Sequence, residues 1–209
     1  MKETPIIFST EMVKAILEKR KTMMRRVIKP NFEATGCKNS DIVHNCNTEY
    51  KGAHMFEIWH PWNTKTPLPL MIRCPYGQVG ARLWVKETWW CPQRGLPVAY
   101  KANLEPYQAD KQIWKSSIFM PRWASRILLE ITEIRVERLQ KITEEDAWAE
   151  GCSPKDTLAY RMQAYPSWNG KLRFAELWDT LNAKRGYSWT SNPWVWTISF
   201  QEIRKVKNE

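Results

Sequence analysis

Residues 18–30, "EKRKTMMRRVIKP", place six cationic side chains in thirteen positions, where a helical pattern gives way to an extended one. Such a cluster is either a solvated turn or a surface that faces an anionic ligand. Arg25 and Arg26 point to opposite faces if the segment is a strand, so we expect at most one of them to line a cleft. The planar guanidinium suits phosphate better than an ammonium group does, because it donates two parallel hydrogen bonds.

A second candidate is the carboxylate of Glu150, which ends the segment "ITEEDAWAEG" at residues 142–151. Thr143 as N-cap and Gly151 as a stop predict a short helix here. The last turn of a helix is the negative end of its dipole and disfavours an anion. A carboxylate in this position therefore indicates a functional site with a nearby cation, unless the side chain is simply exposed to water.

The element before the cationic cluster is expected to position it. "PIIFS" at residues 5–9 predicts a short buried strand, and "STEMVKAILEKRKT" predicts a helix capped by Ser9 or Thr10. Lys19, Arg20 and Lys21 then fall in the last helical turn, where cations complement the dipole. We therefore assign Lys19 and Arg20 to helix-end electrostatics, and residues 23–28 to an extended segment.

The remaining pattern predicts an α+β fold. Residues 70–74 and 81–90 look like a strand pair joined by "PYGQVG", and residues 125–139 look like a strand with a bulge near Glu133. A helix is expected at residues 170–186, burying Leu172, Phe174, Leu177, Trp178 and Leu181. The last strand is expected to be half-buried, with one apolar face that consists of Trp194, Trp196, Ile198 and Phe200.

Residues 31–68 and 91–118 are polar, with scattered aromatic residues, and we interpret them as long insertions in a single domain spanning residues 1–209. The element order has no strict βαβ alternation, which favours a small mixed β-barrel flanked by helices over a doubly wound sheet. The size of the chain, 209 residues of which 43% are hydrophobic, suits one domain with a real core.

Charge favours a polyanionic partner. Lys and Arg outnumber Asp and Glu by 32 to 22, giving a formal charge of +10, which suits RNA or DNA. The chain has no apolar run of about 18 residues and no signal-like N-terminus, so we expect a cytoplasmic protein without membrane contact.

The five cysteines show no regular spacing, which argues against a disulfide framework. Cys37, His44 and Cys46, with His54 or Cys74, could be drawn as zinc ligands, but the tight ligand pairs typical of zinc sites are missing. We therefore expect neither a metal nor another cofactor.

Thirteen tryptophans raise the possibility of base stacking. Most lie on apolar faces and are expected in the core. Trp89, Trp90 and Trp123 lie beside charged or turn residues and are the candidates for stacking. Arg122, in "MPRW", is a further and weaker candidate for phosphate.

Four segments together resemble the ASCH family, which has a PUA-like β-barrel fold, and more narrowly its longer, phage- or prophage-encoded branch. They are "PIIFSTEMVKAILEKRKTMMRRVIKP", "CPYGQVGARLWVKETWW", "MPRWASRILLEITEIRVERLQKITEEDAWAEG" and "FAELWDTLNAKRGYSWTSNPWVWTISF". The resemblance implies a basic cleft beside the barrel that binds RNA, a nucleotide or a modified nucleoside. For a phage protein it implies the host cytoplasm.

One branch of that family hydrolyses N4-acetylcytidine with a lysine, a threonine and a glutamate. The resemblance maps the lysine to Lys21 and the glutamate to Glu150, and it implies that the two side chains meet in the cleft. Met24 stands at the threonine position, and a thioether has no proton to lose as a nucleophile. Thr22 is a poor substitute, because it lies two residues, roughly 6.5 Å, along an extended chain.

These features leave three function classes open. The chain is an ASCH-type RNA- or nucleotide-binding protein, or an N4-acetylcytidine-type amidohydrolase or ribonuclease that uses Lys21 and Glu150. The third class is a phage accessory factor that binds a host protein through its insertions. The basic charge and Met24 favour the first class.

Overall fold

The structure, a computed structural model, describes residues 3–29, 42–50, 53–60, 63–104, 113–152 and 169–203. The helices in these ranges are α1 (Thr10–Leu17), α3 (Glu144–Ala149) and α5 (Gly170–Asn182). The strands are β1 (Glu3–Ile7), β2 (Met23–Val27), β3 (Ile42–Tyr50), β4 (Ala53–His60), β5 (Asn63–Arg73), β6 (Arg82–Lys86), β7 (Trp89–Trp90), β8 (Ala99–Tyr100), β9 (Leu128–Arg138) and β10 (Trp194–Ile203). None of the helices in the described ranges is long and apolar enough to cross a membrane.

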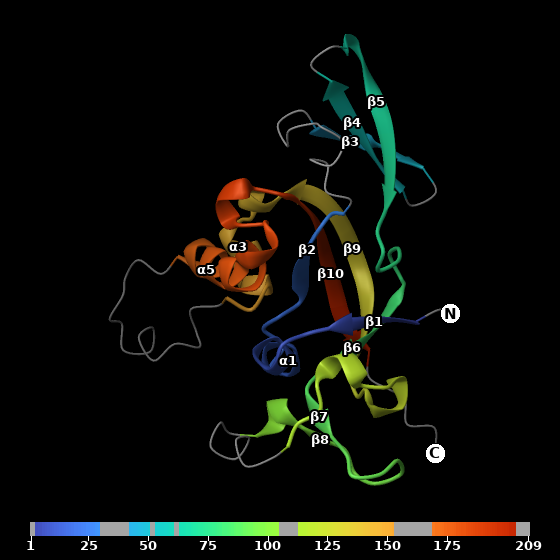
Figure 1. Cartoon of the computed structure of the whole chain (residues 1–209), viewed down its shortest axis with the longest axis vertical. Coiled ribbons are helices and arrows are strands. Elements are labelled where there is room, and N and C mark those ends of the chain that lie inside the picture. Colours follow the sequence, from blue (N-terminus) through green and yellow to red (C-terminus); the bar gives the residue numbers. More distant parts are fainter. Residues whose placement is uncertain are drawn as a thin grey trace.

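A five-stranded sheet forms the centre of the molecule, in the order β1-β6-β9-β10-β2 (Figure 1). β1 runs parallel to β6, and the other neighbouring strands are antiparallel. The α+β class predicted from the sequence is therefore confirmed. β1 and β2 are the two outer strands of this order, so the pairings among the described residues do not include the contact that would close a barrel.

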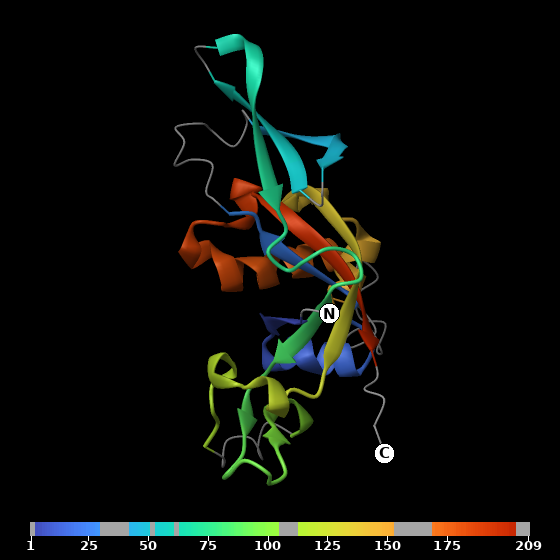
Figure 2. The ribbon, with the colours of Figure 1, turned by 90° about the vertical axis from the view of Figure 1, so that its right-hand side faces the viewer.

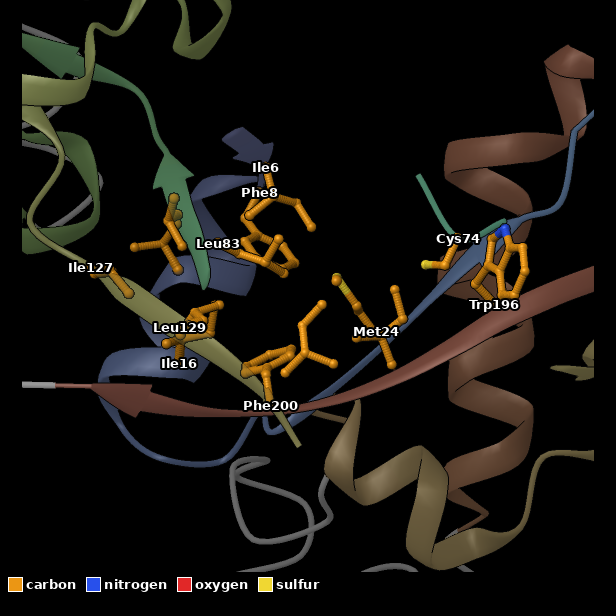
Figure 3. Close-up of a cluster of buried hydrophobic side chains, with 14 of the residues drawn as sticks. Ile6, Phe8, Ile16, Met24, Cys74, Leu83, Ile127, Leu129, Trp196 and Phe200 are labelled. Carbon is orange, nitrogen blue, oxygen red and sulfur yellow. The ribbon is translucent and has the colours of Figure 1, made fainter. Parts of the chain in front are cut away.

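The main core lies on one face of the sheet and involves α1. Its buried side chains come from β1, α1, β2, β6, β9 and β10, and Figure 3 shows Phe8, Met24, Leu129 and Phe200 among them. A second cluster lies on the other face, where Phe174 and Trp178 of α5 pack against Val195 of β10. Apolar burial on both faces is the main stabilising term for such a layered arrangement.

This two-sided packing corrects the prediction for the last strand. Trp196, Ile198 and Phe200 are buried as expected, but Val195 and Thr197 on the opposite face are buried as well. β10 is a central strand, covered by the main core on one face and by α3 and α5 on the other. The prediction for α5 was partly wrong for a related reason: Leu172 and Leu181 are exposed, and only one side of the helix contacts the sheet.

α1 is shorter than predicted. It ends at Leu17, and Lys19 adopts a left-handed backbone conformation with φ of 60°. Lys14 is the basic residue of its last turn, so Lys19, Arg20 and Lys21 do not occupy that turn. The side chain of Arg20 instead pairs with Glu18, through an Nε–Oε2 hydrogen bond of 2.8 Å. The early end of the helix releases Lys21 to enter the site described below.

The strand at residues 128–138 has the predicted irregularity. The register between β9 and β10 shifts between Ser199 and Phe200, whose partners are Glu133 and Ile131, so Thr132 is the extra residue. A bulge turns the following side chains to the opposite face. As a result, Glu137 points to the same side of the sheet as α3.

Two smaller sheets lie at the ends of the long axis (Figures 1 and 2). β3, β4 and β5 form an antiparallel sheet at one end, so the segment 31–68 is not irregular where the structure describes it. β5 pairs with β4, while β6 pairs with β1 and β9, so the predicted strand pair across "PYGQVG" was wrong. β7 and β8 pair at the other end of the axis.

Candidate functional site

Lys21 and Glu150 are in direct contact, as predicted. Lys21 Nζ lies 2.5 Å from Glu150 Oε2 and donates a second hydrogen bond of 2.8 Å to the backbone carbonyl oxygen of Glu150. Their side chains are only 1% and 5% exposed. The contact is therefore a buried ion pair, in which each charge depends on the other because water is excluded.

The backbone fixes this pair from both sides. Lys21 and Glu150 form an isolated antiparallel bridge, and Thr22 N donates to the carbonyl oxygen of Ala149 at 2.8 Å. Gly151 follows with φ of 95°, a conformation that favours glycine. A Cβ atom at Gly151 would lie 3.3 Å from the Cβ of Ala15, so glycine also permits the close approach of α3 to α1.

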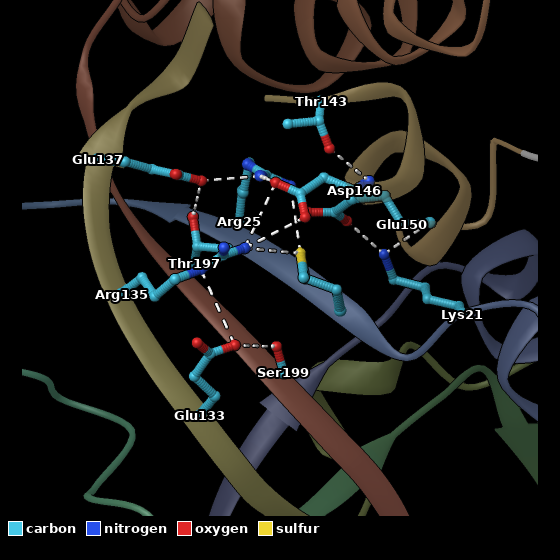
Figure 4. Close-up of polar contacts among 11 residues, drawn as sticks. Lys21, Arg25, Glu133, Arg135, Glu137, Thr143, Asp146, Glu150, Thr197 and Ser199 are labelled. Atoms are coloured by element: carbon cyan, nitrogen blue, oxygen red, sulfur yellow. Dashed lines mark hydrogen bonds and ion pairs between the residues drawn. The ribbon is translucent and has the colours of Figure 1, made fainter. Parts of the chain in front are cut away.

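Arg25 extends the pair into a buried network (Figure 4). Its Nη1 lies 3.4 Å from Glu150 Oε1, and its Nη2 lies 2.8 Å from Glu137 Oε1 and 2.5 Å from Asp146 Oδ2. The guanidinium also lies 5.7 Å from the ring centroid of Phe174. Its side chain has no exposed surface. Three carboxylates thus surround one buried arginine.

Two further groups complete the network. Arg135 Nη2 lies 3.2 Å from Asp146 Oδ1, and Thr197 Oγ1 donates to Glu137 Oε1 at 2.7 Å. The network therefore contains the cations Lys21, Arg25 and Arg135 and the carboxylates Glu137, Asp146 and Glu150, and Arg135 also lies 3.9 Å from Glu133 Oε2. Because each has at least one carboxylate in direct contact, Lys21 and Arg25 are already neutralised in this conformation.

A cavity of about 670 Å³ lies beside this network. Lys21, Glu150 and residues 24–27 of β2 form one part of its wall, and an apolar face of α5 forms another. The α5 residues recur at helical spacing and are Phe174, Leu177, Trp178, Leu181 and Asn182. Ile7, Phe8, Ser9 and Met12, from the end of β1 and the start of α1, also line it.

Both Arg25 and Arg26 line the cavity, so the expectation that at most one would do so was wrong. The reason is the position of β2 at the edge of the sheet. Arg25 faces α3 and α5, and Arg26 faces the main core, where its guanidinium lies 5.6 Å from the Phe8 ring centroid. A cavity along a sheet edge is accessible from both faces, whereas a cavity on one face is not.

Arg26 also connects the two outer strands of the sheet. Its Nη2 donates a hydrogen bond of 2.8 Å to the carbonyl oxygen of Ile7, at the end of β1. Ile7 and Arg26 both line the cavity. The cavity therefore lies where the edges of β1 and β2 approach each other.

The two residues considered for the nucleophile differ in position. Met24 is buried and lines the cavity, as the mapping to the threonine position implied. Thr22 is exposed, does not line the cavity and is held through its backbone, whose carbonyl accepts a hydrogen bond from Phe200 N. The cavity wall therefore contains a thioether where hydrolysis would need a hydroxyl group.

The other predicted binding residues lie elsewhere. Arg122 pairs with Glu3 at 2.5 Å, and Trp89 is only 5% exposed in a small core beside β7. Trp90 is half-buried, and Trp123 is exposed but contacts the edge of Trp89 at a centroid distance of 5.8 Å. None of the four lines the cavity. Trp89 offers no free ring face, because the β7–β8 region has a core of its own.

Cys152 lies beside the site. Burial, together with the negative charge of Glu150, raises the pKa of its thiol to about 11. The thiol is therefore protonated at neutral pH and is not an activated nucleophile. Cys37, one of the residues drawn as a zinc ligand, lies outside the described residues. The described ranges contain no group of three or more side chains that could hold a metal ion.

The sequence analysis missed three members of the network. They are Asp146, Arg135 and Glu137, none of which is among the site residues predicted from the sequence. The alternating charges of "ITEIRVER" could have indicated these residues. Charged side chains on a central strand that a helix covers are removed from water and therefore need partners of opposite charge.

Comparisons with known proteins place these features in a limited context. No protein-family model matches the chain, and no curated protein is similar to it in sequence. Among solved structures, an ASCH domain from Lactobacillus crispatus JV V101 is similar to this chain. The match covers 96% of this chain and 79% of that one, with 11% identity and a TM-score of 0.40. This similarity is too distant to carry an argument about the ligand or the activity of this chain.

Proposed function

We propose that this protein binds a nucleotide or a short stretch of RNA in the cavity beside β2, without turning it over. The observation that carries the proposal is the composition of the cavity wall. Aromatic and apolar side chains from α5 and the end of β1 line the same cavity as the buried Lys21–Glu150 pair and further cations. A planar base can pack against the aromatic and apolar side chains, and its polar edge can form hydrogen bonds with the Lys21–Glu150 pair and the further cations.

Binding is favoured over hydrolysis by the pairing of Lys21. Both of its hydrogen bonds go to Glu150, and within the described residues no hydroxyl group is bonded to its Nζ. Met24 cannot supply a nucleophile. The enzyme alternative, an N4-acetylcytidine-type amidohydrolase or a ribonuclease, is supported by the contact between Lys21 and Glu150 and needs a nucleophile other than Met24, such as the hydroxyl group of Ser9, Thr88 or Ser117 in the cavity lining.

The test is calorimetric titration of the whole protein with cytidine, adenosine, their 5′-monophosphates and a single-stranded hexanucleotide RNA. We expect saturable binding of at least one nucleotide or RNA. Leu177→Asp, which places a charge in the apolar wall, is expected to abolish that binding, whereas Glu176→Asp on the exposed side of the same helix is the matched control. Absence of saturable binding for every probe would overturn the proposal.

A different observation supports the accessory-factor alternative. Five large apolar side chains are exposed around the β7–β8 region, and they are Leu96, Ile113, Ile118, Phe119 and Trp123. Exposed apolar patches commonly mark protein contacts. Capture of the same bacterial protein by the wild type and not by Phe119→Ser, with nucleotide binding unchanged in both, would favour this alternative as a second function.

A further inference from the structure

The cations that line the cavity fall into two groups according to their partners. Lys21 and Arg25 are held by the buried carboxylate of Glu150, and Arg25 also by the partly buried carboxylates of Glu137 and Asp146, at distances of 2.5 to 3.4 Å. Arg26, Lys29 and Arg185 also line the cavity, and none of them has a carboxylate within 4.0 Å among the described residues. The positive charge that remains in the cavity therefore belongs to the second group.

Among Arg26, Lys29 and Arg185, Arg26 is the cation whose side chain is held in place by contacts with the protein. One of its terminal nitrogens donates to the Ile7 carbonyl oxygen, and the guanidinium lies over the ring of Phe8. Its Nε is buried and has no hydrogen-bond partner among the described residues, as is also true of the Nε of Arg25, but Arg26 has no carboxylate beside it. A buried, unused N–H on a charged group is costly, and an anionic acceptor is the partner that would compensate it best.

Lys21 and Arg25, the cations that are paired with carboxylates, disfavour an anionic ligand. An anion placed beside Lys21 would also lie beside Glu150, whose charge repels it, and it would compete with a carboxylate already 2.5 Å from Nζ. A neutral but polar part of a ligand meets no such repulsion. The cavity thus has one region suited to an uncharged polar group and another suited to an anion.

We infer that the ligand is phosphorylated, and that Arg26, with Lys29 and Arg185, binds its phosphate while the base lies towards Met24, Lys21 and Glu150. This inference rests on the proposed function and names its ligand class as nucleotides rather than nucleosides. Arg26 is the specificity-determining residue, because its one hydrogen bond among the described residues goes to the Ile7 carbonyl oxygen and its planar guanidinium can bind a phosphate as well.

The test compares cytidine, cytidine 5′-monophosphate, ribose 5-phosphate and inorganic phosphate by calorimetric titration of the full chain. We expect the monophosphate to bind at least about ten times more tightly than cytidine, since loss of one charged hydrogen bond costs about 1.4 kcal/mol or more. Arg26→Gln should remove that difference, and Arg26→Lys should restore part of it.

Arg185→Gln provides a second variant in case Arg26→Gln does not fold, because Arg185 is exposed and its replacement removes no buried contact. It should weaken monophosphate binding by a smaller factor. Arg173→Gln, an exposed charge on α5 that does not line the cavity, should change nothing.

Equal affinity for cytidine and its monophosphate would overturn the inference while leaving the proposed function intact. So would an Arg26→Gln variant that loses both ligands equally, because Arg26 would then only shape the cavity. Inorganic phosphate binding as tightly as the monophosphate would overturn the nucleotide assignment. Failure of every probe would overturn the proposed function and this inference together.

Discussion

At the scale of single residues, the main feature of this protein is a set of charges that are buried and mutually paired. Removing one partner of such a pair leaves an uncompensated charge in a site without water, which costs about 3–5 kcal/mol. We expect Lys21→Met and Glu150→Gln each to lower the free energy of unfolding by about that amount. The double variant should cost less than the sum, because neither change then strands its partner.

Urea unfolding of the four proteins in this cycle measures the coupling. Arg173→Gln is the matched control, because its partner Glu176 is 56% exposed, and it should cost under about 1 kcal/mol. Strictly additive losses in the Lys21 and Glu150 variants would contradict the pairing seen here.

Met24 is a second single residue that bears on function, because its side chain decides between binding and hydrolysis. We expect the wild type to leave N4-acetylcytidine intact, because Met24 lines the cavity at the position to which the resemblance maps a threonine, and a thioether is no nucleophile here. Met24→Thr should yield detectable cytidine in a chromatographic assay, and Met24→Val, similar in shape to threonine but without the hydroxyl, should not. Product from the wild type would show that another group supplies the nucleophile.

Cys152 gives a prediction about pH. Burial raises its pKa from 9.0 to about 11, so the unfolded chain loses this proton at lower pH than the folded protein does. The contribution to stability is therefore fully present below pH 9 and is lost as the pH rises through about 11. Between pH 9 and about 11, the melting temperature of Cys152→Ala should fall less steeply with pH than that of the wild type. Iodoacetamide should modify Cys152 of the native protein slowly at pH 8. Rapid modification there would contradict the assigned burial.

At the scale of elements, α3 is the part that holds the site together, because its first turn carries Asp146 and its end carries Glu150. Thr143 caps it by accepting a hydrogen bond from Asp146 N at 3.2 Å. Thr143→Ala should lower the free energy of unfolding by about 0.5–2 kcal/mol and should also weaken nucleotide binding, since both carboxylates move with the helix.

Thr143→Ser, which keeps the capping oxygen, is the control and should retain most of the stability and most of the nucleotide affinity of the wild type. Chemical denaturation and calorimetric titration of the same samples separate the two effects. A variant that loses stability but binds nucleotide as tightly as the wild type would show that α3 does not position the site.

At the scale of the whole molecule, the net charge of +10 favours a polyanion, and the number of phosphates that the protein contacts sets how binding depends on salt. If three cations of the cavity contact phosphates, log K for single-stranded RNA should fall with log salt at a slope of about −2, at roughly 0.7 per phosphate. Affinity should then drop about 15-fold between 50 and 200 mM salt. Arg26→Gln should make the slope shallower by about 0.7, and a slope near zero would contradict an electrostatic interface.

Much of the local structure could be predicted from the sequence. The cap at Thr143, the bulge beside Glu133 and the stop at Gly151 follow from side-chain chemistry and periodicity that act over a few residues. The contact between Lys21 and Glu150 came instead from the resemblance to a family, and the helix dipole supplied only the reason that Glu150 needs a cation. The early end of α1 could not be predicted, since its sequence continues with good helix formers and the left-handed residue that follows it is Lys19 rather than a glycine.

The sequence alone determined the α+β class, the positions of the strands and helices near the site, and the excess of positive charge. Only the tertiary structure decided which of those charges remain available to a ligand. Arg25 and Arg26 are identical in type and adjacent in sequence, yet three carboxylates neutralise Arg25 and none lies near Arg26 among the described residues. The reason is physical: periodicity sets which way a side chain points, but the charge it meets comes from elements more than 100 residues away.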